Sequence, residues 1–106
     1  MTGEELYWQL AQQLLADPAV TRSTMMGLPC LRLDGGFFAS LDRRTQALLV
    51  KLPAEQVTAL IAAGHAQPFA PAGRVFRKWA ALPRPDRRRW RTLVDEAKRF
   101  AADSVK

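Results

Sequence analysis

The most distinctive chemistry in this 106-residue sequence is a dense group of cations in its last third. Eight arginine and lysine residues fall between positions 74 and 91, and Asp86 is the single acid among them. We expect seven of these cations to bind an acidic macromolecule: Arg74, Arg77, Lys78, Arg84, Arg87, Arg88 and Arg91. Arginines outnumber lysines twelve to four in the chain, which favours planar, bidentate contacts to phosphate or carboxylate groups.

The charge is uneven along the chain. Residues 74–106 hold 11 basic and four acidic side chains, whereas residues 1–73 hold five basic and six acidic ones. The net charge of +6 therefore resides in the C-terminal third. Such a segment is typical of proteins that bind DNA or an acidic protein surface. The alternative interpretation is a solvated face that binds nothing.

Other residue types that could do chemistry are few. A lone Cys30 and a lone His65 exclude a disulfide framework, a CxxC redox pair and a Cys/His zinc cage built from one chain. We predict that Cys30 is a buried, inert thiol. His65 follows Gly64, a predicted helix terminator, where an imidazolium would interact favourably with the negative end of the helix dipole. Asp34 and Asp42 fall in predicted turns. These patterns predict a non-enzymatic protein with no catalytic residue, metal or cofactor.

Two other classes of function stay open. A small-ligand or enzymatic module with a pocket near Pro68, Phe69 and Trp79 would need polar groups that converge in an apolar hollow. A pure protein-interaction module could associate through an exposed strand edge.

Hydrophobic spacing predicts the elements that position these residues. Helices are predicted from a capping box at Thr2 and Glu5 to Asp17, from Pro53 to Ala63, and from an N-cap at Asp86 past Ala101. Strands are predicted over residues 28–33, 37–41, 47–52 and 74–82. The order α-β-β-β-α-β-α predicts an α+β fold in a single domain over residues 1–106, with an antiparallel sheet packed against helices in two layers.

The chain also lacks membrane signals. No apolar run approaches the ~20 residues that cross a bilayer. The acidic start MTGEEL lacks the basic and apolar regions of a signal peptide. We therefore expect a cytoplasmic protein with no membrane partner.

Several segments in order resemble a known family. They are Met26-Gly27, LDGGFFASL, ALLVKLP, ALIAAGHAQPFAPAGRVFRKWAALP and RRWRTLVDEAKRFA. Over about residues 23–101 the chain resembles the N-terminal domain of TfoX/Sxy proteins and the related MmcQ/YjbR-like proteins. The resemblance implies a compact α+β fold with an antiparallel sheet and assigns no catalytic residue. Full-length TfoX proteins regulate natural competence, and YjbR-like members have been likened to a double-wing DNA-binding arrangement.

Overall fold

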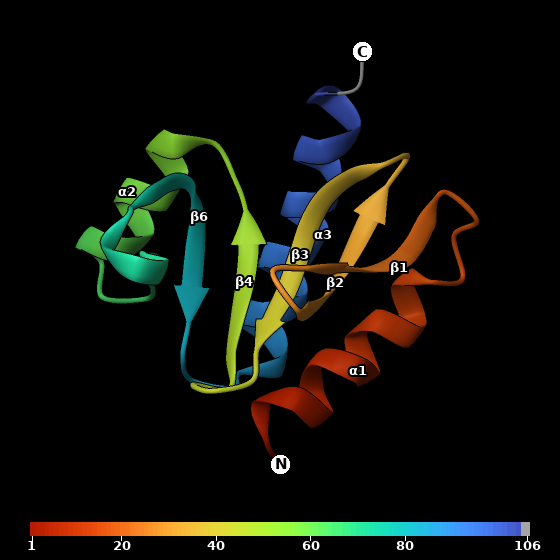
Figure 1. The fold of residues 1–106 in the computed structure, drawn as a ribbon, viewed down its shortest axis with the longest axis horizontal. Coiled ribbons are helices and arrows are strands. Elements are labelled where there is room, and N and C mark those ends of the chain that lie inside the picture. Colours follow the sequence, from red (N-terminus) through yellow and green to blue (C-terminus); the bar gives the residue numbers. More distant parts are fainter. Residues whose placement is uncertain (105–106) are drawn as a thin grey trace.

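Three helices pack on one face of a six-stranded antiparallel sheet in the part of the chain described by this computed structural model, residues 1–104 (Figure 1). The helices are α1 (Gly3–Leu14), α2 (Ala54–Ala62) and α3 (Arg87–Ser104), and a short 3₁₀ helix, η1, spans Pro71–Gly73. The strands are β1 (Val20–Met25), β2 (Leu28–Leu33), β3 (Gly36–Asp42), β4 (Ala47–Lys51), β5 (Gln67–Phe69) and β6 (Phe76–Leu82). They lie in the order β1-β2-β3-β4-β6-β5, so β1 and β5 form the two edges.

The predicted α+β class is confirmed, but the predicted order is incomplete. The observed order is α-β-β-β-β-α-β-β-α, because β1 and β5 are strands that hydrophobic spacing did not reveal. In β1 just Val20 is buried, so an edge strand that is largely polar shows no alternation. In β5 there are three residues, and Pro68 at its centre argues against a strand on propensity alone.

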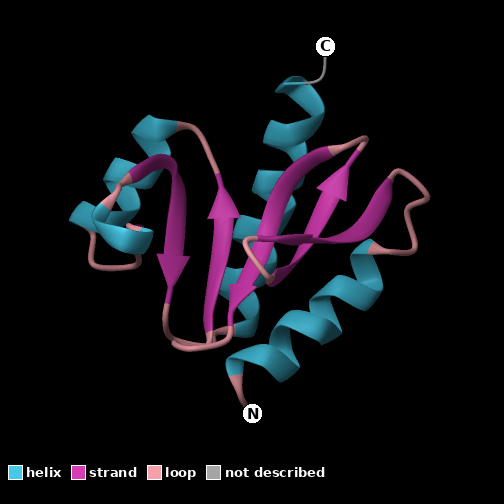
Figure 2. Ribbon diagram, in the orientation of Figure 1, coloured by secondary structure: helices cyan, strands magenta, loops and turns pink. Residues whose placement is uncertain are grey.

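One apolar core joins the three helices to the sheet. It holds Tyr7 and Leu10 of α1, Val57 of α2, and Trp90 and Val94 of α3. Trp90 is fully buried, as its helical spacing predicts. The Tyr7 hydroxyl is buried without a hydrogen-bond partner in the described part of the chain, and burial raises its pKa. Because all three helices share this core, they cover the same face of the sheet, and α3 lies behind the central strands in Figure 2.

The first turn of α1 is fixed by its own cap and by the β3–β4 turn. The Thr2 hydroxyl accepts from the Glu5 backbone at 3.1 Å and Glu5 Oε1 accepts from the Thr2 backbone at 3.0 Å, which confirms the predicted capping box. Gln46 Oε1 accepts from the Glu4 backbone at 2.8 Å. A Cβ atom on Gly3 would collide with the Gln46 carbonyl oxygen. This contact requires a glycine, and it ties the start of α1 to the β3–β4 turn.

The other face of the sheet carries no helix and has its own small apolar cluster, which we call the sheet-face cluster. Its buried members are Leu49, Phe69 and Trp79, and Met25, Leu28, Phe37, Phe76 and Ala81 pack against them. Met25 and Leu28 belong to the end of the β1–β2 hairpin, whose residues therefore reach the central strand β4. The sheet curls accordingly, and β1 crosses in front of β3 in Figure 1.

Candidate functional site

The start of α3 differs in charge from the starts of the other helices. Asp86 caps it as predicted, since its Oδ1 accepts from the Arg89 backbone at 3.1 Å and its carbonyl from the Trp90 backbone at 2.8 Å. The first turn then holds Arg87, Arg88 and Arg89 and no acid. By contrast, the first turns of α1 and α2 contain glutamates. Cations at this position oppose the helix dipole, so the residue choice at α3 does not serve helix stability.

Five exposed arginines surround this helix start, and we call them the arginine surface: Arg84, Arg87, Arg88, Arg89 and Arg91. Trp90, Leu93 and Val94 are buried and fix which side of α3 faces the core. Helical geometry then directs Arg88 outward, and it directs the other helical members of the surface to the flanks.

Two of these flanking arginines reach neighbouring helices. Arg87 Nη2 donates to Gln9 Oε1 of α1 at 2.5 Å. On the opposite flank, Arg89 Nη1 lies 2.7 Å from Nδ1 of His65, just beyond α2. The arginine surface therefore spans the width of the helical layer at this end of the molecule.

The arginine surface is not neutralised by nearby carboxylates. Within residues 1–104 the ion pairs closer than 4.0 Å are Arg43 with Glu4 and Lys98 with Asp17. Glu96 accepts a hydrogen bond from Gln56 Nε2 at 2.7 Å. Asp86 serves as the cap and Asp17 pairs with Lys98 at 2.9 Å, while Asp95, one helical turn after Arg91, forms no ion pair within 4.0 Å in residues 1–104. The guanidinium groups thus keep their capacity to bind an external anion.

Two further arginines approach this surface from the β3–β4 turn. Because Leu48 of β4 pairs with Leu82 of β6, the turn before β4 and the loop after β6 lie at the same end of the sheet. Figure 1 shows these two connections running together at the bottom of the view. Arg44 is exposed there, while Arg43 pairs with Glu4 at 3.4 Å. The sequence alone does not predict this approach, because it depends on the pairing of β4 with β6.

The seven cations predicted as one binding set do not form a single surface. Arg84, Arg87, Arg88 and Arg91 gather at the start of α3. Arg74 instead lies over the Phe76 ring, 5.4 Å from its centroid, beside the sheet-face cluster on the side away from the helices. The remaining two, Arg77 and Lys78, are exposed in β6 between Phe76 and Trp79, where the β5–β6 register shifts. The sheet separates Arg74 from the arginines at the start of α3.

His65 lies just beyond the end of α2, directly after the terminator Gly64. Backbone groups complete that end: Gly64, at φ 77°, donates to the Ile61 carbonyl at 3.0 Å, and the His65 backbone donates to the Leu60 carbonyl at 2.9 Å. A guanidinium can donate but cannot accept, so Nδ1 of His65 accepts the hydrogen bond from Arg89 at 2.7 Å. The His65 side chain therefore links α2 to α3.

A hollow of about 460 Å³ lies next to this link. Its polar lining comes from His65, Gln67, Arg84, Asp86 and Arg89. The Asp86 carboxylate is held by the α3 cap, and Nδ1 of His65 is held by Arg89. The hollow therefore extends the arginine surface and does not present a nucleophile beside a free base.

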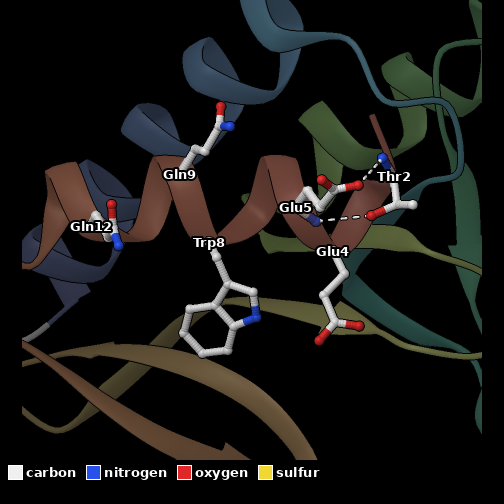
Figure 3. Close-up of a pocket in the computed structure, with 6 residues that line it drawn as sticks. All are labelled: Thr2, Glu4, Glu5, Trp8, Gln9 and Gln12. Carbon is white, nitrogen blue, oxygen red and sulfur yellow. Dashed lines mark hydrogen bonds between the residues drawn. The ribbon is translucent and has the colours of Figure 1, made fainter.

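A second hollow lies on the outer side of α1, and the side chains that line it do not form a reaction centre. Figure 3 shows Glu5 directed at Thr2, while Glu4 and Trp8 extend from another side of the helix. Hydrogen bonds from Thr2 lower the pKa of the Glu5 carboxyl. The Trp8 ring packs edge-on against Tyr7 with centroids 5.1 Å apart. These side chains stabilise α1 and do not converge on a common point.

The remaining candidates from the sequence occupy structural positions. Cys30 is buried as predicted, and burial raises the pKa of its thiol. Asp34 is exposed in the β2–β3 turn, and Asp42 Oδ1 accepts from the Arg44 backbone at 3.0 Å. Phe69 and Trp79 are buried, and their ring centroids are 6.4 Å apart. The two rings therefore pack against each other where the sequence suggested a pocket.

Residues 1–104 contain no group of three or more His, Cys, Asp or Glu side chains placed to hold a metal ion. In the same range, no helix has the length and apolar character needed to span a bilayer. Comparison of the chain with known protein families, curated proteins and solved structures found no match.

Proposed function

We propose that this protein is a non-enzymatic, cytoplasmic domain that binds the sugar-phosphate backbone of duplex DNA through its arginine surface. The observation that carries the proposal is the run Arg87-Arg88-Arg89 in the first turn of α3, against the helix dipole and without carboxylate partners. Positions that break a stability rule are where a function is expected. The resemblance to the TfoX/Sxy and YjbR-like domains supports the same proposal.

The geometry favours phosphate over bases as the group contacted. The Asp86 carboxylate occupies the N-terminus of α3, so the guanidinium groups carry the contact, and arginine forks are good phosphate ligands. Trp90, the aromatic residue at the start of α3, is fully buried and cannot stack on a base. Further along the helix, Asp95 and Glu96 would be repelled by a polyanion. Binding at the start of α3 is therefore expected to be insensitive to base sequence.

The salt dependence of DNA binding tests this proposal. Titration of a fluorescent duplex of about 20 base pairs, followed by anisotropy, should saturate at ~50 mM salt. The logarithm of the binding constant should fall with the logarithm of salt concentration at roughly −0.9 per neutralised phosphate, and two unrelated sequences should behave alike. An acidic peptide that binds while the duplex does not would instead identify an acidic protein as the partner and overturn the proposal.

A matched pair of arginines on α3 makes the test specific. Arg88 and Arg99 are both exposed and lie 11 residues apart on the same side of the helix, one at the start and one near the end. Arg88→Ala should weaken duplex binding and reduce the salt slope by about one unit, whereas Arg99→Ala should change little. Equal losses in the two variants would contradict binding at the start of α3.

A further inference from the structure

The face of the sheet that carries no helix holds a second, separate group of cations beside aromatic rings. The Arg32 guanidinium lies 4.5 Å from the centroid of the Phe37 ring, and the Arg74 guanidinium lies 5.4 Å from that of Phe76. Phe37 and Phe76 both pack on the sheet-face cluster. Two arginine-aromatic pairs therefore belong to the same apolar cluster.

A cation on β4, Lys51, lies between the strands that carry these pairs. Lys51 pairs in register with Trp79, and it lies two residues after Leu49, so alternation directs it to the same face as the cluster. None of Arg32, Lys51 and Arg74 forms an ion pair within 4.0 Å in residues 1–104. The Nε atom of Arg32 is buried and has no hydrogen-bond partner in the described structure.

Carboxylates occur just at the margins of this face. Asp34 lies in the turn before β3, and Asp42 is the last residue of β3, where it holds the Arg44 backbone at 3.0 Å. Apart from Asp42, the charged side chains on the strands are positive. A ligand that lies across the strands thus meets cations and ring faces, which favours a polyanion.

The exposure of the aromatic side chains indicates which kind of ligand this face can bind. The centre of the cluster is closed, with Leu49 1%, Phe69 7% and Trp79 9% exposed. Partly exposed apolar side chains surround this centre, and Met26 and Val75 beside them are 62% and 56% exposed, but the cations on this face favour an anionic ligand over an apolar one. Phe37 and Phe76 are partly exposed, and flat bases can stack on such rings or on the guanidinium planes above them. Paired bases in a duplex cannot do so.

We propose that this face binds single-stranded nucleic acid, with bases stacked at the Arg32-Phe37 and Arg74-Phe76 pairs and phosphate groups at Lys51. The site lies across the sheet from α3 and does not rest on the proposed function of the arginine surface. Its ligand also differs, since stacking requires unpaired bases and the arginine surface requires phosphate alone.

Anisotropy with a fluorescent oligothymidine of about 15 nucleotides tests the site. Phe76→Leu should weaken binding about fivefold or more, because each stacked base contributes on that scale. Arg74→Ala, an exposed position, provides a variant that keeps the sheet-face cluster intact and should also weaken binding. Circular dichroism checks that each variant is folded.

The chain offers a matched control on the helical side. Arg22 lies 5.9 Å from the centroid of Trp8, a third arginine-aromatic pair, and its register partner is the core residue Leu31. Arg22→Ala should leave oligothymidine binding unchanged. The proposal fails if the oligonucleotide does not bind at ~50 mM salt. It also fails if binding is lost in Arg88→Ala and kept in Phe76→Leu and Arg74→Ala, which would place the single strand on the arginine surface.

Amide chemical shifts provide a readout that needs no variant. Oligothymidine should shift the amide signals of Phe37, Lys51 and Phe76 and leave those of the first turn of α3 in place. Duplex DNA should give the reverse pattern if the proposed function also holds. Shifts by both ligands at α3 alone would overturn the sheet-face site, whereas silence of α3 toward duplex would overturn the proposed function by itself.

Discussion

Arg89 donates a hydrogen bond to Nδ1 of His65 across 2.7 Å and so joins the first turn of α3 to a residue just beyond the end of α2. The two residues are 24 positions apart in the chain. The contact fixes the Arg89 side chain of the arginine surface and uses one of its donor groups. It also connects two helices that otherwise meet through the Gln56–Glu96 hydrogen bond and apolar contacts.

A double-mutant cycle measures this link. His65→Ala and Arg89→Met should each reduce the free energy of unfolding, and their coupling should be about 0.5 to 1 kcal/mol because the pair is solvent-exposed. His65→Gln should retain part of the coupling, since its amide oxygen can accept from Arg89. Urea unfolding provides the energies, and a coupling of zero would show that the hydrogen bond contributes nothing to the folded state.

Stability and binding should change in opposite directions when the charge of Arg88 is reversed. Arg88→Glu places an acid at the positive end of the α3 dipole, so the free energy of unfolding should rise by about 0.3 to 1 kcal/mol. The same variant should bind duplex DNA more weakly than Arg88→Ala, because it adds repulsion to the lost contact. Thermal unfolding and anisotropy on one preparation check both signs. A loss of stability would contradict the dipole argument.

Gly3 should tolerate no side chain. The methyl group of Gly3→Ala would meet the Gln46 carbonyl oxygen, so either α1 or the β3–β4 turn must move, and we expect a loss of about 1 to 3 kcal/mol. Gly36→Ala is the control, because its methyl group would lie 3.5 Å from the Leu33 carbonyl oxygen in ordinary contact. Comparable urea midpoints for the two variants would show that the start of α1 is free to shift.

Acid should remove the contribution of the Asp17–Lys98 pair. The hydrogen bond from Lys98, followed by that from the Ala19 backbone, lowers the pKa of Asp17 below its ordinary value of 3.8. A carboxyl whose pKa is lower in the folded state stabilises that state above the ordinary value and loses its effect as the pH falls through the lowered one. Lys98→Met should therefore flatten the decline in stability on acidification below 3.8. Arg99→Met, on the same helix, should leave the decline as it is.

Local spacing was sufficient to predict the capped starts of α1 and α3 and the central strands, whereas α1 ends at Leu14, before the predicted Asp17. The capping box of Thr2 and Glu5, the N-cap of Asp86 and the burial of Trp90 each depend on residues within a few positions of one another. The edge strands β1 and β5 escaped prediction because an edge need not bury alternate side chains.

The candidate site required tertiary information. Arg74 and Arg84 are ten positions apart, yet a sheet separates Arg74 from the arginine surface that Arg84 joins. Conversely, Arg44 comes near that surface because β4 pairs with β6. A linear count of cations therefore indicated that a basic surface exists, whereas strand pairing and alternation decide which cations share it.

The two margins of the sheet are unequal, and this limits how copies of the chain can associate. At β5, Pro68 withholds a backbone donor, so growth of the sheet is hindered on that side. At the other edge, the six residues of β1 are open to pairing. An edge strand that pairs antiparallel with its own copy does so about a twofold axis. Any association by sheet extension should therefore stop at a closed pair and should not continue into a filament.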